Sequence, residues 1–361
     1  MLTEQRKEPN TMESNKIELS CPLPINDYKN VLLAHGGGGK LTQQLVQKMF
    51  ASRFRNEFLD QSHDGAILPL NGTRLAFTTD SYVIKPIVFP GGDIGTLAVN
   101  GTVNDLAMCG AKPLYLSAAF VIEEGFSMDE LRRVVDSMQT AAEQADVMLV
   151  TGDTKVVDRG KGDKIFITTA GIGSIESGID INPKNARASD TIIVSGNIGV
   201  HGIAIMSVRE GLEFETKVES DCAPLSGLVR TMLEASRQIH VLRDPTRGGV
   251  ASALNEIAET AGVGMLIEEE KIPIDDSVSG ACEILGFDPL YVANEGKLIA
   301  IVPRDDADKV LAAMRSHPLG RNAAIIGTVT PDHPKTVLMK SRIGGTRVVD
   351  MLSGEQLPRI C

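Results

Sequence analysis

Four consecutive glycines precede a segment of helical period, and they are Gly36, Gly37, Gly38 and Gly39. A glycine-rich turn that leads into a helix leaves backbone amides free to surround a phosphate. The run is not a Walker P-loop, because Ala34 stands where the first glycine belongs and Leu41 replaces the serine or threonine that holds magnesium. A lid or a plain turn would also use glycines. The run alone therefore does not decide between these roles.

Acidic and amide side chains recur at the ends of apolar segments in four places. They are Asp80, Asn104 with Asp105, Gly152 with Asp153 and Thr154, and Asp244. Ligands gather at such segment ends in α/β folds, and magnesium prefers carboxylate and phosphate oxygens. Any one of these residues could instead cap a helix or shape a turn. Four of them beside a glycine run favour a nucleotide held through a metal ion.

Two further residues could move protons near such a nucleotide. Lys155 follows Asp153 by two positions, and Glu295 precedes an apolar strand in the second half of the chain. A lysine shifted toward its neutral form, or a glutamate with a raised pKa, can serve in an elimination. Lysine and glutamate are also the commonest solvated surface residues. Their positions alone assign neither of them a catalytic role.

The final residue is a cysteine, Cys361, preceded by Pro358, Arg359 and Ile360. A terminal thiol can reach into another site and capture an acyl or carbamoyl group, whereas an accidental exposed thiol is a liability. We therefore favour a functional Cys361. The five cysteines are odd in number, widely spaced and free of any CxxC pair, which argues against a disulfide framework or a cysteine zinc site; they are Cys21, Cys109, Cys222, Cys282 and Cys361.

The first half of the chain alternates short apolar runs with stretches of helical period, which is typical of an α/β or α+β fold. We predict strands at 75–79 and 147–151 and a helix over 94–108. A helix is also expected to begin near Lys40, with an apolar stripe of Leu41, Leu45, Met49, Phe50 and Phe54. Another follows the Ser127 and Glu130 capping-box pair, with a buried face of Leu131, Val134, Val135, Met138, Ala142 and Ala145.

The second half begins after a polar stretch at 182–190. We predict a helix over 250–261 that Gly262 ends, and strands at 191–195, 265–268 and 297–303. The predicted organisation is a disordered extension at 1–30, an N-terminal domain at 31–187, an α+β domain at 188–335, and a C-terminal segment with a mobile tail at 336–361.

Composition limits the class of protein. The chain has 361 residues and a net charge of −11, which argues against a nucleic acid or an anionic membrane surface as the main partner. Fourteen aromatic residues and no tryptophan make stacking platforms for bases a poor expectation. No apolar run approaches the roughly 20 residues that span a bilayer. The polar residues 1–20 lack a signal-peptide core, so we expect a cytoplasmic protein.

The motifs together resemble the HypE family of hydrogenase maturation proteins, the carbamoyl dehydratases of nickel-iron hydrogenase cyanide synthesis. The resemblance runs from His35 to Cys361 and includes TTDSYVI at 78–84, GTVNDL at 101–106, VTGDTKVV at 150–157, DPTRGGV at 244–250, ANEGKL at 293–298 and PRIC at 358–361. Single loops are shared with aminoimidazole ribonucleotide synthase, selenophosphate synthetase and thiamine-phosphate kinase. The terminal PRIC is specific to the HypE family.

The resemblance implies a two-domain fold like that of aminoimidazole ribonucleotide synthase, α/β followed by α+β, whose N-terminal domain dimerises through its sheet. It implies that the carbamoyltransferase HypF loads a carbamoyl group on Cys361, that ATP with Mg²⁺ drives its dehydration to a thiocyanate, and that the HypC–HypD complex receives the cyanide. Asp80, Asp105 and Asp153 would hold the metal, Asp244 would complete its shell, and Asn104 and the glycine backbone would assist. Lys155 and Glu295 match the reactive positions, and either could be the base.

A small-molecule kinase or synthetase of the same fold, with an incidental Cys361, is the alternative reading. Selenophosphate synthetases carry a reactive cysteine or selenocysteine just before the glycine-rich loop, whereas Cys21 lies about fifteen positions upstream of it. A carrier that binds ATP without turnover is another alternative. A carrier without Lys155 or Glu295 would still pass on its modification, whereas a dehydratase would stall with a carbamoylated thiol.

Overall fold

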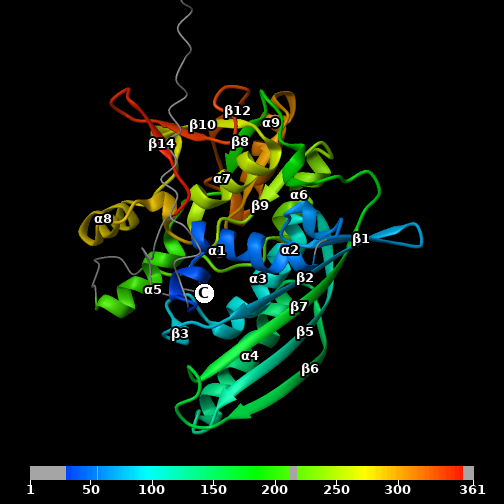
Figure 1. Ribbon diagram of the computed structural model, residues 1–361, viewed down its shortest axis with the longest axis vertical. Helices are drawn as coiled ribbons and strands as arrows, with labels where there is room; N and C mark the ends of the chain where they lie inside the picture. Colours follow the sequence, from blue (N-terminus) through cyan, green and yellow to red (C-terminus); the bar gives the residue numbers. More distant parts are fainter. Residues whose placement is uncertain (1–29, 55, 212–217, 353–361) are drawn as a thin grey trace, which may run out of the picture. The chain divides into compact units, whose positions relative to one another are not determined.

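The computed structural model describes residues 30–54, 56–211 and 218–352, and the chain from Leu32 onward forms one compact unit (Figure 1). Cys361 with the predicted mobile tail, and the predicted N-terminal extension apart from Asn30, lie outside the described residues. In the part of the chain that the structure describes, no helix combines the length and the apolar character needed to cross a membrane.

The first half forms a five-stranded sheet in the order β1-β2-β7-β5-β6 (Figure 1). Its strands are β1 (Ala66–Leu70), β2 (Thr73–Tyr82), β5 (Ala111–Glu123), β6 (Met148–Val157) and β7 (Ile165–Ile175). Only β5 and β6 pair in parallel, and the other neighbours are antiparallel. A small hairpin of β3 (Val88–Phe89) and β4 (Gly92–Asp93) lies between β2 and the first long helix.

Two helices accompany this sheet, α3 (Ile94–Met108) and α4 (Met128–Gln144). Strand β2 alternates accordingly, since Ala76, Thr78 and Tyr82 are buried while Phe77 is exposed. The prediction of helix 94–108 is confirmed, and Asp93 caps it by accepting the Thr96 amide hydrogen.

The predicted capping of α4 by Ser127 is also confirmed, because the Ser127 hydroxyl accepts from the amides of Asp129 and Glu130. On the predicted buried face of this helix Val134 and Met138 are buried, but Val135 remains 47% exposed. That assignment of Val135 was wrong because the helix buries a narrower stripe than the sequence pattern allows.

The second half builds a seven-stranded sheet in the order β14-β13-β10-β12-β8-β11-β9. Its strands are β8 (Thr191–Val194), β9 (Val241–Arg243), β10 (Gly264–Glu268), β11 (Ile299–Val302), β12 (Ala324–Thr330), β13 (Val337–Lys340) and β14 (Thr346–Val349). Its helices are α5 (Val200–Glu210), α6 (Ser226–Ala235), α7 (Gly249–Ala261), α8 (Asp276–Leu285) and α9 (Ala307–Ser316). The mixed α/β and α+β content agrees with the predicted fold class. The C-terminal segment predicted at 336–361 contributes two strands to this sheet.

The two halves share a buried core. Leu106 and Met108 of α3 belong to the same apolar cluster as Leu228 and Met232 of α6. Because a core cluster of this kind removes apolar surface of both halves from water at once, it fixes α3 against the second half of the chain. Helix α3 therefore sits where residues from both sheets can reach it.

The helix predicted to begin near Lys40 does begin there, as α1 (Lys40–Leu45), a π-helical segment (Val46–Ala51) and α2 (Ser52–Phe54). Its predicted apolar stripe is not buried, since Met49, Phe50 and Phe54 are all exposed. Short 3-10 turns complete the helical elements, and they are Leu33–Gly36, Leu59–Gln61, Pro183–Asn185, Glu269–Lys271, Pro289–Tyr291, Arg304–Asp306 and Pro318–Gly320.

Candidate active site

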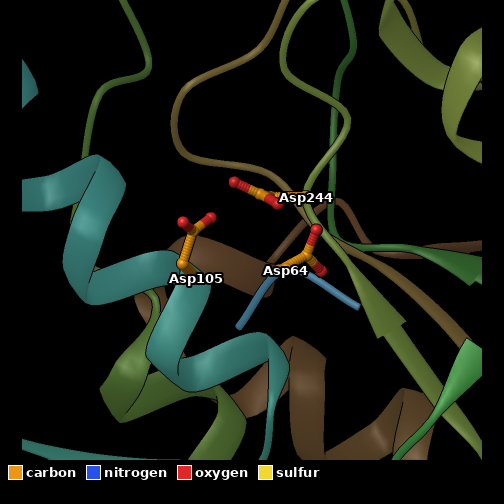
Figure 2. A group of neighbouring side chains, drawn as sticks. All are labelled: Asp64, Asp105 and Asp244. Carbon is orange, nitrogen blue, oxygen red and sulfur yellow. The ribbon is translucent and has the colours of Figure 1, made fainter. Parts of the chain in front are cut away.

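Three aspartates from separate parts of the chain meet between the two halves. Figure 2 shows Asp64, Asp105 and Asp244 pointing toward one another, and one carboxylate oxygen of each lies within 4.8 Å of the others. Three converging carboxylates are the hard oxygen donors that Mg²⁺ prefers. The Oδ2 atom of Asp64 is moreover buried without a hydrogen-bond partner. The donor set therefore fits a divalent cation.

Each aspartate is placed by a different element. Asp105 lies in the fourth turn of α3, Asp64 lies two residues before β1, and Asp244 directly follows β9. Asp105 lies within the helix predicted at 94–108, three residues before its last residue. The sequence reasoning missed Asp64 entirely. Asp64-Gly65 precedes the apolar run at 66–70, whereas Asp80 and Asp244 follow such runs, so position after an apolar run could not identify Asp64.

Crowding of negative charge perturbs the cluster. Burial, the carboxylates of Asp244 and Asp64, and that of Asp80 raise the pKa of Asp105 well above its usual value, although the Thr78 hydroxyl donates to Asp105 Oδ2 at 2.8 Å. Burial and Asp64 raise the pKa of Asp244 to about 7, while Arg243 opposes this shift. Without a cation the cluster therefore retains protons near neutral pH.

One cation already serves this cluster. The Arg243 Nη1 atom lies 2.8 Å from Asp64 Oδ1, and its Nη2 atom lies 2.5 Å from Glu256 Oε2. Burial alone would lower the pKa of Arg243, but the carboxylates of Asp64 and Glu256 raise it above its usual value. The Arg243 guanidinium carries one positive charge, whereas Asp64, Asp105 and Asp244 supply three carboxylates. This excess of acid is the electrostatic reason why a metal ion would bind.

The acidic cluster opens into a small pocket that also contains Glu295. Its lining residues include Asp80, Asp105, Asp244, Arg247 and Glu295. Glu295 is 4% exposed, and its Oε1 atom has no hydrogen-bond partner. Burial, Asp244, Asp221 and Asp80 raise its pKa well above the usual value. Glu295 can therefore hold or accept a proton beside the metal ligands.

Asn104 lies at the same junction but uses its side chain within the protein. Its Nδ2 atom donates to the carbonyls of Ala223 at 3.1 Å and Glu295 at 3.2 Å, and its Oδ1 atom accepts the Leu225 amide hydrogen at 2.8 Å. These contacts satisfy the whole carboxamide. In this arrangement Asn104 joins α3 to two loops of the second half, and the predicted contact of its side chain with a nucleotide stays a prediction.

The glycine run packs against the loop that follows Asp244. Arg247, which lines the pocket, donates from Nη1 to the Gly36 carbonyl at 3.0 Å. Gly38 has φ +76°, and a Cβ atom there would lie 2.6 Å from Arg247 Cβ. A Cβ on Gly39 would lie 2.3 Å from the carbonyl oxygen of Leu352. Glycine is required at both positions by close contacts within the chain, and Gly37 directly precedes them.

The predicted residues from 152 to 155 lie elsewhere in this chain. Asp80 is paired through Thr169 and Ala118 to Gly152, so Asp80 and Gly152 are three strand spacings apart, about 14 Å. Asp153 and Lys155 are exposed on β6, 2.7 Å apart, and this bond lowers the pKa of Asp153. Within one chain, Gly152, Asp153, Thr154 and Lys155 therefore do not converge with Asp80, Asp105 and Asp244.

The raised pKa of Asp244 predicts an unusual pH dependence of stability. An unfolded aspartate titrates near 4, so from about pH 4 to 7 the folded chain binds more protons at Asp244. The free energy of unfolding of the metal-free chain should fall as pH rises through this window, by up to about 1.4 kcal/mol per pH unit for each such group. We expect a higher Tm at pH 5.5 than at pH 8, and recovery at pH 8 when Mg²⁺ is added.

The matched control for this experiment is Asp244→Asn, which should flatten the decline of Tm with pH and weaken the effect of Mg²⁺. Differential scanning fluorimetry across the pH range gives both readings. A Tm of the unaltered chain that is the same at pH 5.5 and pH 8, and that Mg²⁺ leaves unchanged, would contradict a proton-loaded acidic cluster.

Comparisons with known proteins agree with this fold. The models of the AIR synthase related protein family match residues 62–175 with the N-terminal domain and residues 187–340 with the C-terminal domain. The carbamoyl dehydratase HypE of Cupriavidus necator is 53% identical over 350 residues, which cover 96% of this chain and 100% of that protein.

Solved structures support the same family. A HypE–HypF complex contains a chain with a TM-score of 0.82 and 50% identity, covering 85% of this chain and 99% of that one. A HypE in complex with ATP has a TM-score of 0.78 and 48% identity, covering 92% and 100%. The resemblance found in the sequence is thus confirmed, and the chain belongs to the HypE family of carbamoyl dehydratases, enzymes with the two-domain fold of AIR synthase related proteins.

Proposed function

We propose that this protein dehydrates a carbamoyl group carried as a thiocarbamate on Cys361 to a thiocyanate, using ATP, and so provides the cyanide ligand of the nickel-iron hydrogenase iron. The observation that carries the proposal is the pocket in which Glu295 adjoins the Asp64, Asp105 and Asp244 cluster. Its supports are the family membership and the relatives solved with ATP and with HypF. HypF is the proposed carbamoyl donor, HypC–HypD the acceptor, and the cytoplasm the location.

ATP and Mg²⁺ are the proposed cofactors. Asp64, Asp105 and Asp244 would hold the ion, with Asp80 at the edge of the same pocket. Bound there, magnesium would neutralise charge on the phosphates during transfer. The glycine run, joined to the pocket through Arg247, would cover the phosphates from the other side. This arrangement uses no Walker motif.

The proposed reaction proceeds in two steps. The carbamoyl oxygen takes the γ-phosphoryl group of ATP, ADP leaves, and one proton is lost from the carbamoyl nitrogen. The carbon–oxygen bond then breaks, phosphate departs, and loss of the second nitrogen proton completes the carbon–nitrogen triple bond. Thiocarbamate and ATP thus yield thiocyanate, ADP and phosphate. Phosphorylation is needed because an unactivated amide oxygen is a poor leaving group.

Glu295 and Lys155 are the proposed groups for proton removal and for steadying the carbamoyl group. Glu295 lines the pocket with an unpaired, buried oxygen, which supports its proposed role as the base. In the same chain two strands, β7 and β5, separate β6, which carries Lys155, from β2, which carries Asp80. We therefore propose that Lys155, with Asp153, acts in the site of a second copy.

A homodimer formed through the first sheet would provide that second copy. The face of the sheet turned away from α3 carries a row of paired, exposed apolar residues across four strands, namely Phe77, Ile172, Tyr115 and Met148. They are between 39% and 59% exposed. Large adjacent apolar side chains on a sheet face mark an interaction surface. Strand β6 lies at the edge of the sheet, where a second copy could continue it.

If the dimer forms through this face, a charged side chain in the row of exposed apolar residues should weaken it. Ile172→Asp should shift the protein from dimer to monomer, because it would bury a carboxylate at the centre of the interface. Sedimentation velocity at several concentrations measures the shift. Val135→Asp is the matched control, since Val135 is an equally exposed apolar residue on α4. A dimer that survives Ile172→Asp would contradict an interface on this face.

The function is tested by mass spectrometry of the full chain. The protein is incubated with HypF, carbamoyl phosphate and ATP, and then with Mg²⁺ and either ATP or a non-hydrolysable analogue. We expect a carbamoyl adduct on Cys361 that loses one water only with ATP. An unmodified Cys361 with ATP consumed on another substrate would favour the kinase or synthetase alternative instead.

A further inference from the structure

The side chain of Glu295 is not held in place by its own carboxylate. Its Oε1 atom is buried and lacks a hydrogen-bond partner. A catalytic group must nevertheless be fixed closely, because displacement by about 1 Å can cost about 100-fold in rate. The position of Glu295 must therefore be set through its backbone and its immediate neighbours.

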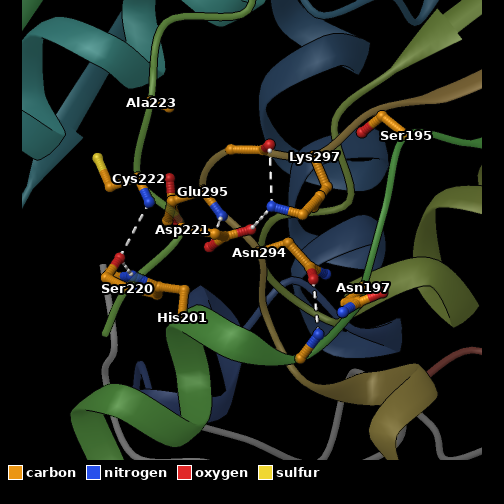
Figure 3. A network of polar contacts seen from close by, with 12 residues as sticks. Ser195, Asn197, His201, Ser220, Asp221, Cys222, Ala223, Asn294, Glu295 and Lys297 are labelled. Carbon is orange, nitrogen blue, oxygen red and sulfur yellow. Dashed lines mark hydrogen bonds and ion pairs between the residues drawn. The ribbon is translucent and has the colours of Figure 1, made fainter. Parts of the chain in front are cut away.

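That backbone is held at both ends by buried polar groups, and Figure 3 shows the group at the amide end, Asp221. The Glu295 amide donates to Asp221 Oδ1 at 3.1 Å, and the Glu295 carbonyl accepts from Asn104 Nδ2 at 3.2 Å. The next residue is Gly296, where a Cβ atom would lie 1.8 Å from the Asp221 carbonyl oxygen. The Asp221 loop and the Glu295 loop are thus packed backbone to backbone, which only glycine permits.

Asp221 is held in turn by Lys297. The Lys297 Nζ atom lies 3.0 Å from Asp221 Oδ2, and these side chains are only 14% and 4% exposed. The same ammonium donates to the Gly296 carbonyl at 3.3 Å. A buried carboxylate is tolerated when it is paired and hydrogen-bonded. The Asp221 carboxylate therefore binds both the Glu295 amide and the Lys297 ammonium, on either side of Gly296.

Neither member of this pair is among the residues that line the pocket. They can influence the reaction through the segment that they hold, and Asp221 also acts through its charge, which raises the pKa of Glu295. We propose that Asp221 and Lys297 are positioning residues, which fix Glu295 toward the metal ligands by clamping the Glu295–Lys297 segment. This inference rests on the proposed catalytic role of Glu295. In it, Asp221 positions Glu295 by accepting the hydrogen bond of the Glu295 amide, and not by its charge.

Two charge-neutral double variants separate the acceptor from the charge. Asp221→Asn with Lys297→Met keeps an acceptor for the Glu295 amide, whereas Asp221→Ala with Lys297→Met removes it. Each full-length protein is loaded on Cys361 by HypF, and loss of water is followed by mass spectrometry in a single turnover at increasing ATP. We expect the first variant to stay within threefold of the unaltered rate. The second should be about 10- to 100-fold slower at saturating ATP, with half-saturating ATP unchanged.

Addition of Glu295→Gln completes the test. In a Glu295→Gln background, loss of the acceptor should slow the reaction no further, because the group being positioned is gone. Equal rates of the two double variants at saturating ATP would overturn the inference. If Glu295→Gln alone dehydrates at the unaltered rate, the proposed role of Glu295 fails instead. Should the alanine variant not fold, Asp221→Ser with Lys297→Met repeats the comparison with a side chain too short to bind the Glu295 amide.

Discussion

Glu295→Gln should slow the loss of water from carbamoylated Cys361 by about 10²- to 10⁴-fold, the usual contribution of a general acid or base. The substitution keeps the size of the side chain but removes its ability to exchange a proton at Oε1, which lies buried and unpaired in the pocket. The adduct should therefore accumulate on Cys361. Intact-protein mass spectrometry after loading and a chase with Mg²⁺ and ATP measures this directly.

The variant should also be at least as stable as the unaltered chain. The raised pKa of Glu295 reflects an unfavourable buried carboxylate, and a neutral amide avoids that cost. Glu283→Gln, at an exposed position of α8, is the matched control and should leave the rate unchanged. Rapid dehydration by Glu295→Gln would remove this residue from the chemistry and leave Lys155 as the base.

Asp105→Asn should reduce the Mg²⁺-dependent reaction by about three orders of magnitude, because a metal ion contributes several kcal/mol of charge stabilisation. Asp105 is the only member of the acidic cluster that lies within a helix, so its position cannot adjust to recover the ion. Isothermal titration with Mg²⁺ and a non-hydrolysable ATP analogue should show weakened binding of both.

Asp136→Asn is the matched control, because it also removes one aspartate from a helix, at an exposed position of α4. The thermal stability of Asp105→Asn without metal should rise, since burial and like charges raise the pKa of the Asp105 carboxyl. Unchanged Mg²⁺ affinity in Asp105→Asn would place the ion elsewhere.

The elements with strong local signals could be predicted from the sequence. Helix α3 has the predicted bounds 94–108, and the structure shows that the residue directly before it, Asp93, caps it. Helix α7 was found because Gly262 takes the left-handed conformation at its end, with φ +70°. Such signals lie within a few residues of the element that they bound, so one sequence is enough to detect them.

Other features depend on contacts that are distant in the sequence. Asp64 is identified only when β9 brings Arg243 to it and α3 brings Asp105. Lys155 was paired with Glu295 on motif grounds, yet strand order separates β6 from Asp80 by two intervening strands. The stripe of Met49, Phe50 and Phe54 has the period of a buried helix, but these side chains are exposed within the part of the chain that the structure describes. Hydrophobic periodicity predicts that a helix has an apolar face, but it does not predict which residues cover that face.

The end of the described chain is fastened beside the glycine run. Leu352 accepts the Lys40 amide hydrogen at 2.9 Å, Asp350 pairs with Lys40 Nζ at 2.5 Å, and the Tyr291 hydroxyl donates to the Asp350 carbonyl at 2.9 Å. Nine residues, 353–361, separate this anchor from the Cys361 thiol, and such a length spans at most about 30 Å.

The anchor therefore acts as a tether. Confinement of a thiol within such a radius gives it an effective concentration in the millimolar range, so delivery of the carbamoyl group to ATP is intramolecular and independent of protein concentration. Lengthening the segment between Leu352 and Cys361 would dilute the thiol at its own active site while leaving every catalytic contact unchanged. The number of residues between Leu352 and Cys361 therefore sets the effective concentration of the thiol at the active site.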